Sequence, residues 1–238
     1  MALYRDEGIV LRTYKLGEAD RIVVMLTRGH GKVRAVAKGV RKTSSRFGAR
    51  LEPPHHLQVL FYEGRELDVV TQVDTVDHFR AVRDDLDRLT QAVPMLEAAD
   101  QLAMEREPNA ALFQLLLGAL RALAQSGSAL VVPAFFLKLL ALEGFRPVVD
   151  ECVECGTTEE LVAYDVDGGG IHCTRHRRGV PISAGALALV QDVLGGRLGQ
   201  ALQAEPSPVT VEVGHLATRA LEHLLERHLR SISVLDRR

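Results

Sequence analysis

Hydrophobic and polar residues alternate along roughly the first 80 positions, a pattern that predicts short β-strands. Turn-forming residues separate the strands at Gly17–Asp20 and Gly29–Gly31, and a long polar segment follows at Gly39–Pro54. Five strands in this length are typical of a small closed barrel, of either the oligonucleotide-binding (OB) or the SH3-like type. The predicted strands lie at Ile9–Leu11, Arg21–Thr27, Lys32–Lys38, Leu57–Tyr62 and Leu67–Val76.

Beyond about residue 78 the hydrophobic residues recur every three or four positions, which predicts helices. The first helix carries an apolar stripe from Val82 to Ala99, and Pro94 either kinks it or divides it into two. The segment Val132–Gly144 is so apolar that we expect a central, buried helix, with Gly144 as part of its stop signal. Further helices are predicted at Ala110–Ala124, Ser183–Leu194 and Val213–Leu229.

The composition is that of a folded protein from a reducing, intracellular location. The chain has 238 residues, of which 47% are hydrophobic and 25% charged, so disorder is not expected. No apolar stretch reaches the roughly 18 residues that a membrane span needs, and the N-terminus shows no secretory signal. Three cysteines do not make a disulfide framework in a chain of this size. A cytoplasmic protein without a membrane partner is therefore expected.

The formal net charge of −2 conceals an uneven distribution of charge along the chain. Residues 1–50 carry twelve Lys or Arg and four Asp or Glu, a net charge of +8. Residues 51–171 carry eight and twenty-one, a net charge of −13, and residues 172–238 carry nine and six, a net charge of +3. A cationic segment of this kind suits a polyanion as binding partner.

The positive charge is concentrated between positions 21 and 50, where no acidic residue occurs. In a strand at Lys32–Lys38 the basic side chains share one face, while Val33, Ala35 and Ala37 point to the core. The strand leads into a cationic, hydroxyl-bearing loop, whose side chains are typical donors to phosphate oxygens. Aromatic residues are only 5% of the chain, so contacts to the nucleic-acid backbone should dominate over stacking on Tyr14, Phe47 or Tyr62. The alternative is a solvated face that only keeps the barrel soluble.

All three cysteines lie in one 25-residue window, as Cys152-x-x-Cys155 and Cys173-x-x-His176. A CxxC turn presents two thiolates to one point, and a second pair at the same spacing completes a tetrahedral set that suits zinc. A hairpin is predicted between the two pairs, with Asp167–Gly170 as its turn. This is the layout of a zinc ribbon, in which one structural Zn²⁺ ion holds the base of the hairpin.

Other uses of the cysteines fit the sequence less well. Free cysteines would leave the matched spacing unexplained, and thioredoxin-like redox chemistry needs a βαβ context that is absent. A catalytic zinc keeps one coordination position open, whereas four protein ligands leave none. A nucleic-acid deaminase needs an H-x-E motif, which the chain does not contain. His172 could replace His176 as a ligand, but its adjacency to Cys173 makes that geometry poorer.

Motifs in the first part of the chain resemble the bacterial recombination mediator family RecO. They are Glu7-Gly-Ile-Val-Leu-Arg12, Gly17-Glu-Ala-Asp-Arg21-Ile and Leu26-Thr-x-x-x-Gly31-Lys-Val-x-Ala-Val-Ala-Lys38-Gly-Val-Arg41. The order of parts is similar over essentially the full length. The resulting expectation is an α+β, multi-domain fold: an OB-type five-stranded barrel at 1–79, a helical domain at 80–149, a zinc-binding insert at 150–180, and C-terminal helices at 181–238 that pack with the helical domain.

The resemblance implies a nucleoid-associated protein of DNA repair and homologous recombination that has no catalytic residues. It implies binding of single- and double-stranded DNA and annealing of complementary strands. Implied partners are RecR and the tail of single-stranded DNA-binding protein, with RecA an indirect partner that loads afterwards. The family's DNA-contacting positions are matched by Arg34, Lys38, Arg41, Lys42 and Arg46, and Lys32 joins them on the same strand. Its zinc motif is matched by Cys152, Cys155, Cys173 and His176, although that motif more often ends in a fourth cysteine and some members lack it.

Two hypotheses from other classes compete with DNA handling. The first is a zinc-ribbon scaffold that contacts RNA or protein in the transcription or translation machinery. The second is an enzyme with a nucleic-acid substrate, but no P-loop, G-x-S-x-G elbow or H-E-x-x-H motif occurs in the chain. A strand-annealing assay separates DNA handling from the scaffold hypothesis.

Overall fold

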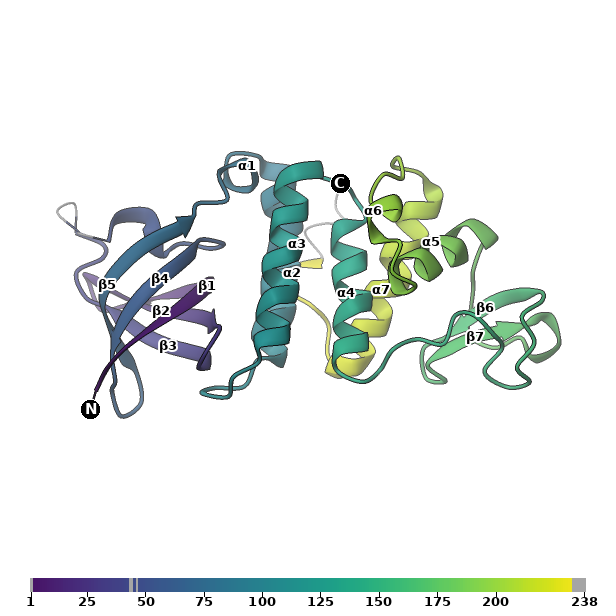
Figure 1. Cartoon of the computed structure of the whole chain (residues 1–238), viewed down its shortest axis with the longest axis horizontal. Helices are drawn as coiled ribbons and strands as arrows, with labels where there is room; N and C mark the ends of the chain where they lie inside the picture. Colours follow the sequence, from purple (N-terminus) through teal and green to yellow (C-terminus); the bar gives the residue numbers. More distant parts are fainter. Residues whose placement is uncertain (1, 43–44, 46, 233–238) are drawn as a thin grey trace. The chain divides into compact units, whose positions relative to one another are not determined.

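The structure is a computed structural model that describes residues 2–42, 45 and 47–232 (Figure 1). The chain divides into two compact units, Met1–Ala124 with Ser231–Arg238, and Gln125–Arg230. Among the described helices, none has both the length and the apolar character that crossing a membrane requires. The four-part domain division expected from the sequence stays a prediction.

Five strands of the first unit close into a barrel in the order β1-β2-β3-β5-β4, which confirms the predicted five-stranded barrel. Neighbouring strands are antiparallel, except that β3 and β5 run parallel. A bulge after Val10 bends β1, which pairs with β4 along its first half and with β2 along its second. The strands are β1 (Leu3–Leu16), β2 (Asp20–Thr27), β3 (Gly31–Ala37), β4 (His56–Tyr62) and β5 (Asp68–Asp77).

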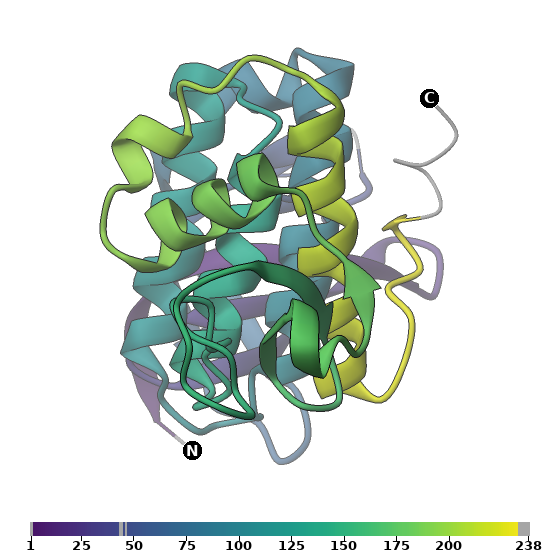
Figure 2. The same ribbon diagram turned by 90° about the vertical axis from the view of Figure 1, so that its right-hand side faces the viewer.

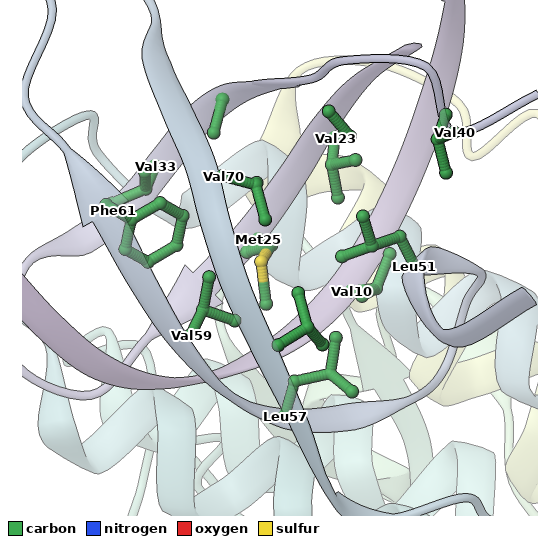
Figure 3. Close-up of a cluster of buried hydrophobic side chains, with 13 residues drawn as sticks. Val10, Val23, Met25, Val33, Val40, Leu51, Leu57, Val59, Phe61 and Val70 are labelled. Atoms are coloured by element: carbon green, nitrogen blue, oxygen red, sulfur yellow. The ribbon is translucent and has the colours of Figure 1, made fainter. Parts of the chain in front are cut away.

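Alternate side chains of the strands meet inside the barrel, as Figure 3 shows. Met25 and Phe61 are among the largest of these side chains, and both are fully buried. Val40 and Leu51 join the same cluster from the segment between β3 and β4, Leu51 from a short 3₁₀ helix (Gly48–Leu51). Burying one such aliphatic side chain stabilises the fold by roughly 1.5–3 kcal/mol. The segment that reads as polar in the sequence therefore contributes to the barrel core.

Helices α1 (Arg80–Arg83), α2 (Leu86–Leu102) and α3 (Ala110–Ser126) follow the barrel. The carboxylate of Asp85 accepts hydrogen bonds from the backbone N–H groups of Asp87 and Arg88, which caps the start of α2. Helix α2 continues through Pro94, so the predicted division at this residue is wrong. The predicted stripe is divided earlier, at Asp84 and Asp85, because Val82 belongs to α1 and the rest of the stripe to α2. It packs against β1, and this contact places the end of α2 beside the barrel.

The second unit contains a helical bundle and a small sheet. Helices α4, α5 and α7 pack against one another (Figure 2), and nine of the twelve residues of α4 are buried, as predicted for a central helix. Helix α7 starts earlier than the sequence predicted, because Ser207 and Thr210 form a capping box with Pro208 in the first turn. The helices are α4 (Val131–Leu142), α5 (Ala184–Leu194), α6 (Leu198–Ala201) and α7 (Pro208–Leu225).

The small sheet of the second unit has three strands in the order β7-β6-β8. Its strands are β6 (Leu161–Asp165), β7 (Gly170–Cys173) and β8 (Val180–Pro181). β6 and β7 are antiparallel, as expected for the predicted hairpin, and a 3₁₀ helix (Thr174–His176) follows β7 directly. Strand β8, like helix α6, was not predicted from the sequence.

Candidate nucleic-acid interface and metal centre

The alternation predicted for β3 is present in the structure. Val33, Ala35 and Ala37 are buried in the barrel core, while Lys32 and Arg34 point to the outer face of the sheet. Two of the predicted DNA-binding residues therefore share one face of a strand, as a period of two residues requires. The structure gives both of them protein partners, which the sequence did not indicate.

Lys32 is largely enclosed and faces the end of α2. Its Nζ donates a hydrogen bond to the backbone carbonyl of Asp100 at 2.6 Å and lies 3.5 Å from the Asp100 carboxylate. The Lys32 side chain is only 15% exposed. Arg34, at 42% exposure, lies 3.6 Å from the carboxylate of Glu105, which is itself exposed. An exposed pair of this kind contributes about 0–1 kcal/mol, so Arg34 can exchange Glu105 for another anion at little cost.

The segment that follows α2 runs along β3 as a strap, which we define as Ala103–Glu107. The backbone N–H of Lys32 donates to the carbonyl of Met104 at 3.0 Å, and the N–H of Arg106 donates to the carbonyl of Lys32 at 3.1 Å. Gly31 lies directly against this strap, since a Cβ atom there would be 1.9 Å from the Glu107 carbonyl oxygen. Gly31 also has a φ of +65°, so both its backbone and its neighbour require glycine.

A buried carboxylate fixes the strap to the barrel. Asp68, which is fully buried, lies 2.7 Å from a guanidinium nitrogen of Arg106 and accepts a hydrogen bond from the Tyr4 hydroxyl. The hydrogen bond to Asp68 raises the pKa of Arg106. Burial and the same carboxylate raise the pKa of Tyr4 well above its usual range. Arg106 therefore stays charged and Tyr4 stays protonated as donors to Asp68.

Three further predicted DNA-binding residues, Lys38, Arg41 and Lys42, are exposed on the segment after β3. That segment is tied to the β1–β2 turn: the backbone N–H of Arg41 donates to the carbonyl of Ala19 at 3.0 Å, and an Arg41 guanidinium nitrogen lies 3.3 Å from the carbonyl oxygen of Gly17. The side chains of Lys38 and Lys42 have no hydrogen-bond or ion-pair partner within the described part of the chain. Arg46, the last predicted contact, lies outside the described residues.

The cations of the barrel thus fall into two groups. Lys32 is held by protein groups, whereas Lys38 and Lys42 face solvent at the edge where β3 ends. Sequence reasoning did not single out Arg12, although it belongs to this surface: its Nε lies 2.6 Å from the Asp100 carboxylate, and its guanidinium lies 4.7 Å from the centre of the Tyr14 ring. Strict alternation from Val10, which is in the barrel core, would place Arg12 on the inner face of β1. The bulge between these two residues shifts the alternation and places Arg12 on the outer face, so the sequence pattern alone does not reveal it.

The second site is a cluster of Cys152, Cys155, Cys173 and His176 that could hold a metal ion. Their ligand atoms all lie within 4.8 Å of one another. The Sγ atoms of Cys155 and Cys173 are 3.9 Å apart, and the Nδ1 atom of His176 lies 3.5 Å from the Cys173 Sγ. Tetrahedral zinc, with bonds of about 2.3 Å to sulfur and about 2.0 Å to nitrogen, places its ligand atoms about 3.5–3.8 Å apart. The residues present therefore fit a zinc-sized ion.

Local backbone geometry brings the ligands of this cluster together. Gly156, with a φ of +70°, closes the CxxC turn, and its N–H donates to the carbonyl of Cys152 at 2.8 Å. Burial disfavours ionisation of Cys152, but hydrogen bonds from backbone N–H groups outweigh it and lower the pKa of the thiol to about 6. A thiol that ionises this readily is suited to binding a cation, because the thiolate is the ligand form.

His176, and not His172, joins the cysteines in the structure. His172 is buried on β7, where its Nε2 lies 3.8 Å from the carboxylate of Asp165. The adjacency of His172 to Cys173 directs the two side chains to opposite faces of the strand, whereas the 3₁₀ turn after Cys173 returns His176 to the thiols. The preference for His176 derived from spacing thus agrees with the geometry.

The chain is similar to known proteins along its whole length. The family model "Recombination protein O N terminal" matches residues 1–79, and "Recombination protein O C terminal" matches residues 83–235. The chain is 46% identical, over 243 residues and 100% of both chains, to the "DNA repair protein RecO" of Frankia casuarinae. It is 44% identical, again over 243 residues and 100% of both chains, to the "DNA repair protein RecO" of Thermobifida fusca. The similarity therefore includes the barrel, the helices and the small sheet.

Proposed function

We propose that this chain, which belongs to the recombination protein O (RecO) family, is a DNA repair and recombination protein that binds single- and double-stranded DNA. In this proposal residues 1–79 form the DNA-binding barrel. Residues 80–149 and 181–238 form the helical part of the protein, and residues 150–180 form the zinc-binding insert. The names of both relatives, which describe DNA repair proteins, support the assignment.

The observation that carries the proposal is the exposed cationic edge of the barrel. Lys38, Arg41 and Lys42 lie there on a segment that hydrogen bonds hold in place, and Arg34 adjoins them on β3. Each lysine or arginine that contacts a phosphate releases counterions, so binding should weaken as salt rises and depend little on sequence. Lys32 stays a predicted contact, although its bonds to Asp100 favour a structural role.

Annealing of complementary strands and mediator action are further parts of the proposed function. Cations that neutralise phosphates reduce the repulsion between two strands, which favours annealing of complementary sequences. As a mediator the protein would bind RecR and the acidic tail of single-stranded DNA-binding protein, so that RecA loads afterwards. The protein would act by binding, without making or breaking a covalent bond.

We propose Zn²⁺ as the ion of the Cys152, Cys155, Cys173 and His176 cluster. Thiolate and imidazole ligands are the donor set that tetrahedral zinc prefers. Bound zinc supplies folding free energy to the insert, whose own hydrophobic core is small. Four protein ligands fill a tetrahedral site, which makes the role structural.

The test is an annealing assay with two complementary labelled strands, used naked and coated with single-stranded DNA-binding protein. Wild-type protein should accelerate annealing of both at low salt, and the double variant Lys38→Ala/Lys42→Ala should be slower. The control is Arg80→Ala, which removes an arginine whose side chain is 89% exposed and lies outside the cationic edge. If wild-type protein neither binds nor anneals DNA at low salt, the proposal is wrong and the scaffold hypothesis gains support.

A further inference from the structure

The outer face of β1, β2 and β3 is covered over one half and open over the other. In the covered half Val24 and Leu26 are fully buried, although they do not belong to the barrel core. In the open half the register places Tyr14, Ile22 and Val36 side by side across the three strands. Tyr14 is 40% exposed, and its two neighbours are half-buried. An accessible aromatic ring thus lies at the end of a short apolar row.

Cations lie on both sides of this row. Arg12 and Arg34 stand two positions before the row, on β1 and β3, and Lys38 stands two positions after Val36, directly beyond the end of β3. The Arg12 guanidinium lies 4.7 Å from the centre of the Tyr14 ring, a cation–π contact. The Nε of the same guanidinium lies 2.6 Å from the Asp100 carboxylate. Arg12 is therefore fixed by Asp100 and in turn holds the Tyr14 ring.

We propose that this row is a platform on which an unpaired nucleobase of single-stranded DNA stacks, with Tyr14 supplying the ring. The inference rests on the proposed DNA binding and adds a base contact to the phosphate contacts. Every base has a flat π face that stacks on an aromatic ring with little dependence on sequence. Arg34 and Lys38 lie on either side of the row, where they can reach the phosphates that flank the stacked base. In a duplex the faces of the bases are hidden, so the platform selects single strands.

The other aromatic residues considered for stacking are placed differently. Phe47 packs against the barrel core, so its ring is partly covered. Tyr62 is 42% exposed, but it pairs with Leu3, at the opposite end of β1 from Tyr14. The residue after it is Glu63, which is acidic, so no cation follows this ring along the chain as Lys38 follows Val36. The combination of an exposed ring and flanking cations therefore favours Tyr14.

The experiment compares two oligonucleotides with the same number of phosphates, oligo-dT and a fully abasic strand of equal length. Binding of each is measured by fluorescence anisotropy at one low salt concentration. Wild-type protein should bind oligo-dT more tightly than the abasic strand, by roughly five-fold to a hundred-fold for one stacked base. Tyr14→Leu should remove this preference and leave binding of the abasic strand unchanged, because its phosphate contacts remain. Tyr14→Phe should keep the preference, because it keeps the ring.

Tyr62→Leu is the matched comparison, since it removes another exposed tyrosine from the same barrel. The preference for oligo-dT should persist in this variant. If wild-type protein binds both strands equally, or if Tyr14→Leu keeps the preference, the platform is wrong while the proposed function stands. If Tyr62→Leu removes the preference, the platform is at Tyr62 and this inference fails. If wild-type protein binds neither strand, both proposals fail.

A second measurement does not depend on the folding of the leucine variant. The chain has four tyrosines and no tryptophan, so tyrosine emission can be observed directly. Saturating oligo-dT should quench part of this emission in wild-type protein, and the abasic strand should quench less. In Tyr14→Phe the difference between the two strands should vanish although oligo-dT still binds. A difference that persists in Tyr14→Phe would overturn the assignment of the stacking ring to Tyr14.

Discussion

Lys32 on β3 and Asp100 on α2 bind each other at the covered half of the barrel's outer face: the Nζ donates to the backbone carbonyl at 2.6 Å and lies 3.5 Å from the carboxylate. Lys32→Ala would leave the largely buried Asp100 without one of its two cations. We therefore expect the free energy of unfolding to fall by about 1–3 kcal/mol. Urea unfolding of the purified variant checks this value.

The control for Lys32→Ala is Lys38→Ala, which removes an exposed lysine from the same strand region. Its unfolding free energy should stay within about 0.5 kcal/mol of that of the wild type. Equal losses in the two variants would contradict the distinction between a structural and a solvent-facing lysine.

The strap Ala103–Glu107 should depend on the contact between Arg106 and Asp68. Arg106→Ala removes a cation 2.7 Å from a fully buried carboxylate, which then keeps only uncharged donors, among them the Tyr4 hydroxyl. We expect a loss of about 1–3 kcal/mol in unfolding free energy, measured in urea. Arg80→Ala, which breaks an exposed pair with Asp84, should cost less than about 0.5 kcal/mol. If Arg106→Ala leaves the free energy of unfolding unchanged, other contacts hold the strap.

Features that depend on neighbouring residues could be predicted from the sequence. The inward positions Val33, Ala35 and Ala37 follow from strict alternation, which fixes the face of each residue in a strand. The cluster of cysteines and His176 follows from two ligand pairs, each with two residues between its members, on either side of a hairpin. In both cases the residues concerned lie near one another in the sequence, within one strand for β3 and within a 25-residue window for the metal cluster.

Contacts between distant segments could not be predicted in this way. Lys32 and Asp100 are 68 positions apart, and nothing in either local sequence indicates the other. The strap beside β3 has no strand pattern, because its contact is a single isolated bridge. The early start of α7, by contrast, could have been predicted, because Ser207 and Pro208 are recognisable start signals of a helix. The apolar stripe begins later, and it is this stripe that predicts a start at Val213.

The metal cluster gives a prediction about composition as well as stability. Cys173→Ser removes the ligand whose Sγ lies 3.5 Å from the His176 Nδ1, so zinc content should fall from stoichiometric to a small fraction. The thermal unfolding midpoint should fall too, because metal binding is part of the folding free energy of such a site. Arg175→Ala, an exposed neighbour on the same 3₁₀ turn, should change neither value. Stoichiometric zinc in Cys173→Ser, measured by atomic emission, would refute the ligand assignment.

The buried His56 makes the stability of the barrel sensitive to acid. Its Nε2 lies 2.7 Å from a carboxylate oxygen of Glu7, but burial outweighs this partner and lowers the pKa of His56 below 6.5. The unfolded chain therefore binds a proton that the folded chain does not, and the free energy of unfolding decreases as pH falls below about 6.5 towards the folded-state pKa. Above about 6.5 this contribution to stability is fully present.

His56→Gln should weaken this dependence on pH. Between about pH 7.5 and about pH 5.5 the variant should lose less unfolding free energy than wild-type protein, because one proton-linked group is gone. His55, whose pKa burial also lowers, remains and leaves part of the loss in place. The control His215→Gln replaces an exposed histidine on α7 and should lose as much as wild type. Equal losses in all three proteins would contradict the role of His56.

The central claim is that the barrel binds DNA through phosphate contacts at Arg34 and Lys38. The most direct measurement is the slope of the logarithm of the binding constant for single-stranded DNA against the logarithm of salt concentration. Because each lost phosphate contact to single-stranded DNA lowers the magnitude of this slope by roughly 0.7, Arg34→Ala/Lys38→Ala should lower it by about 1.4, with little dependence on the DNA sequence. A slope in the double variant equal to that of the wild type would place the DNA-binding surface elsewhere and contradict the claim.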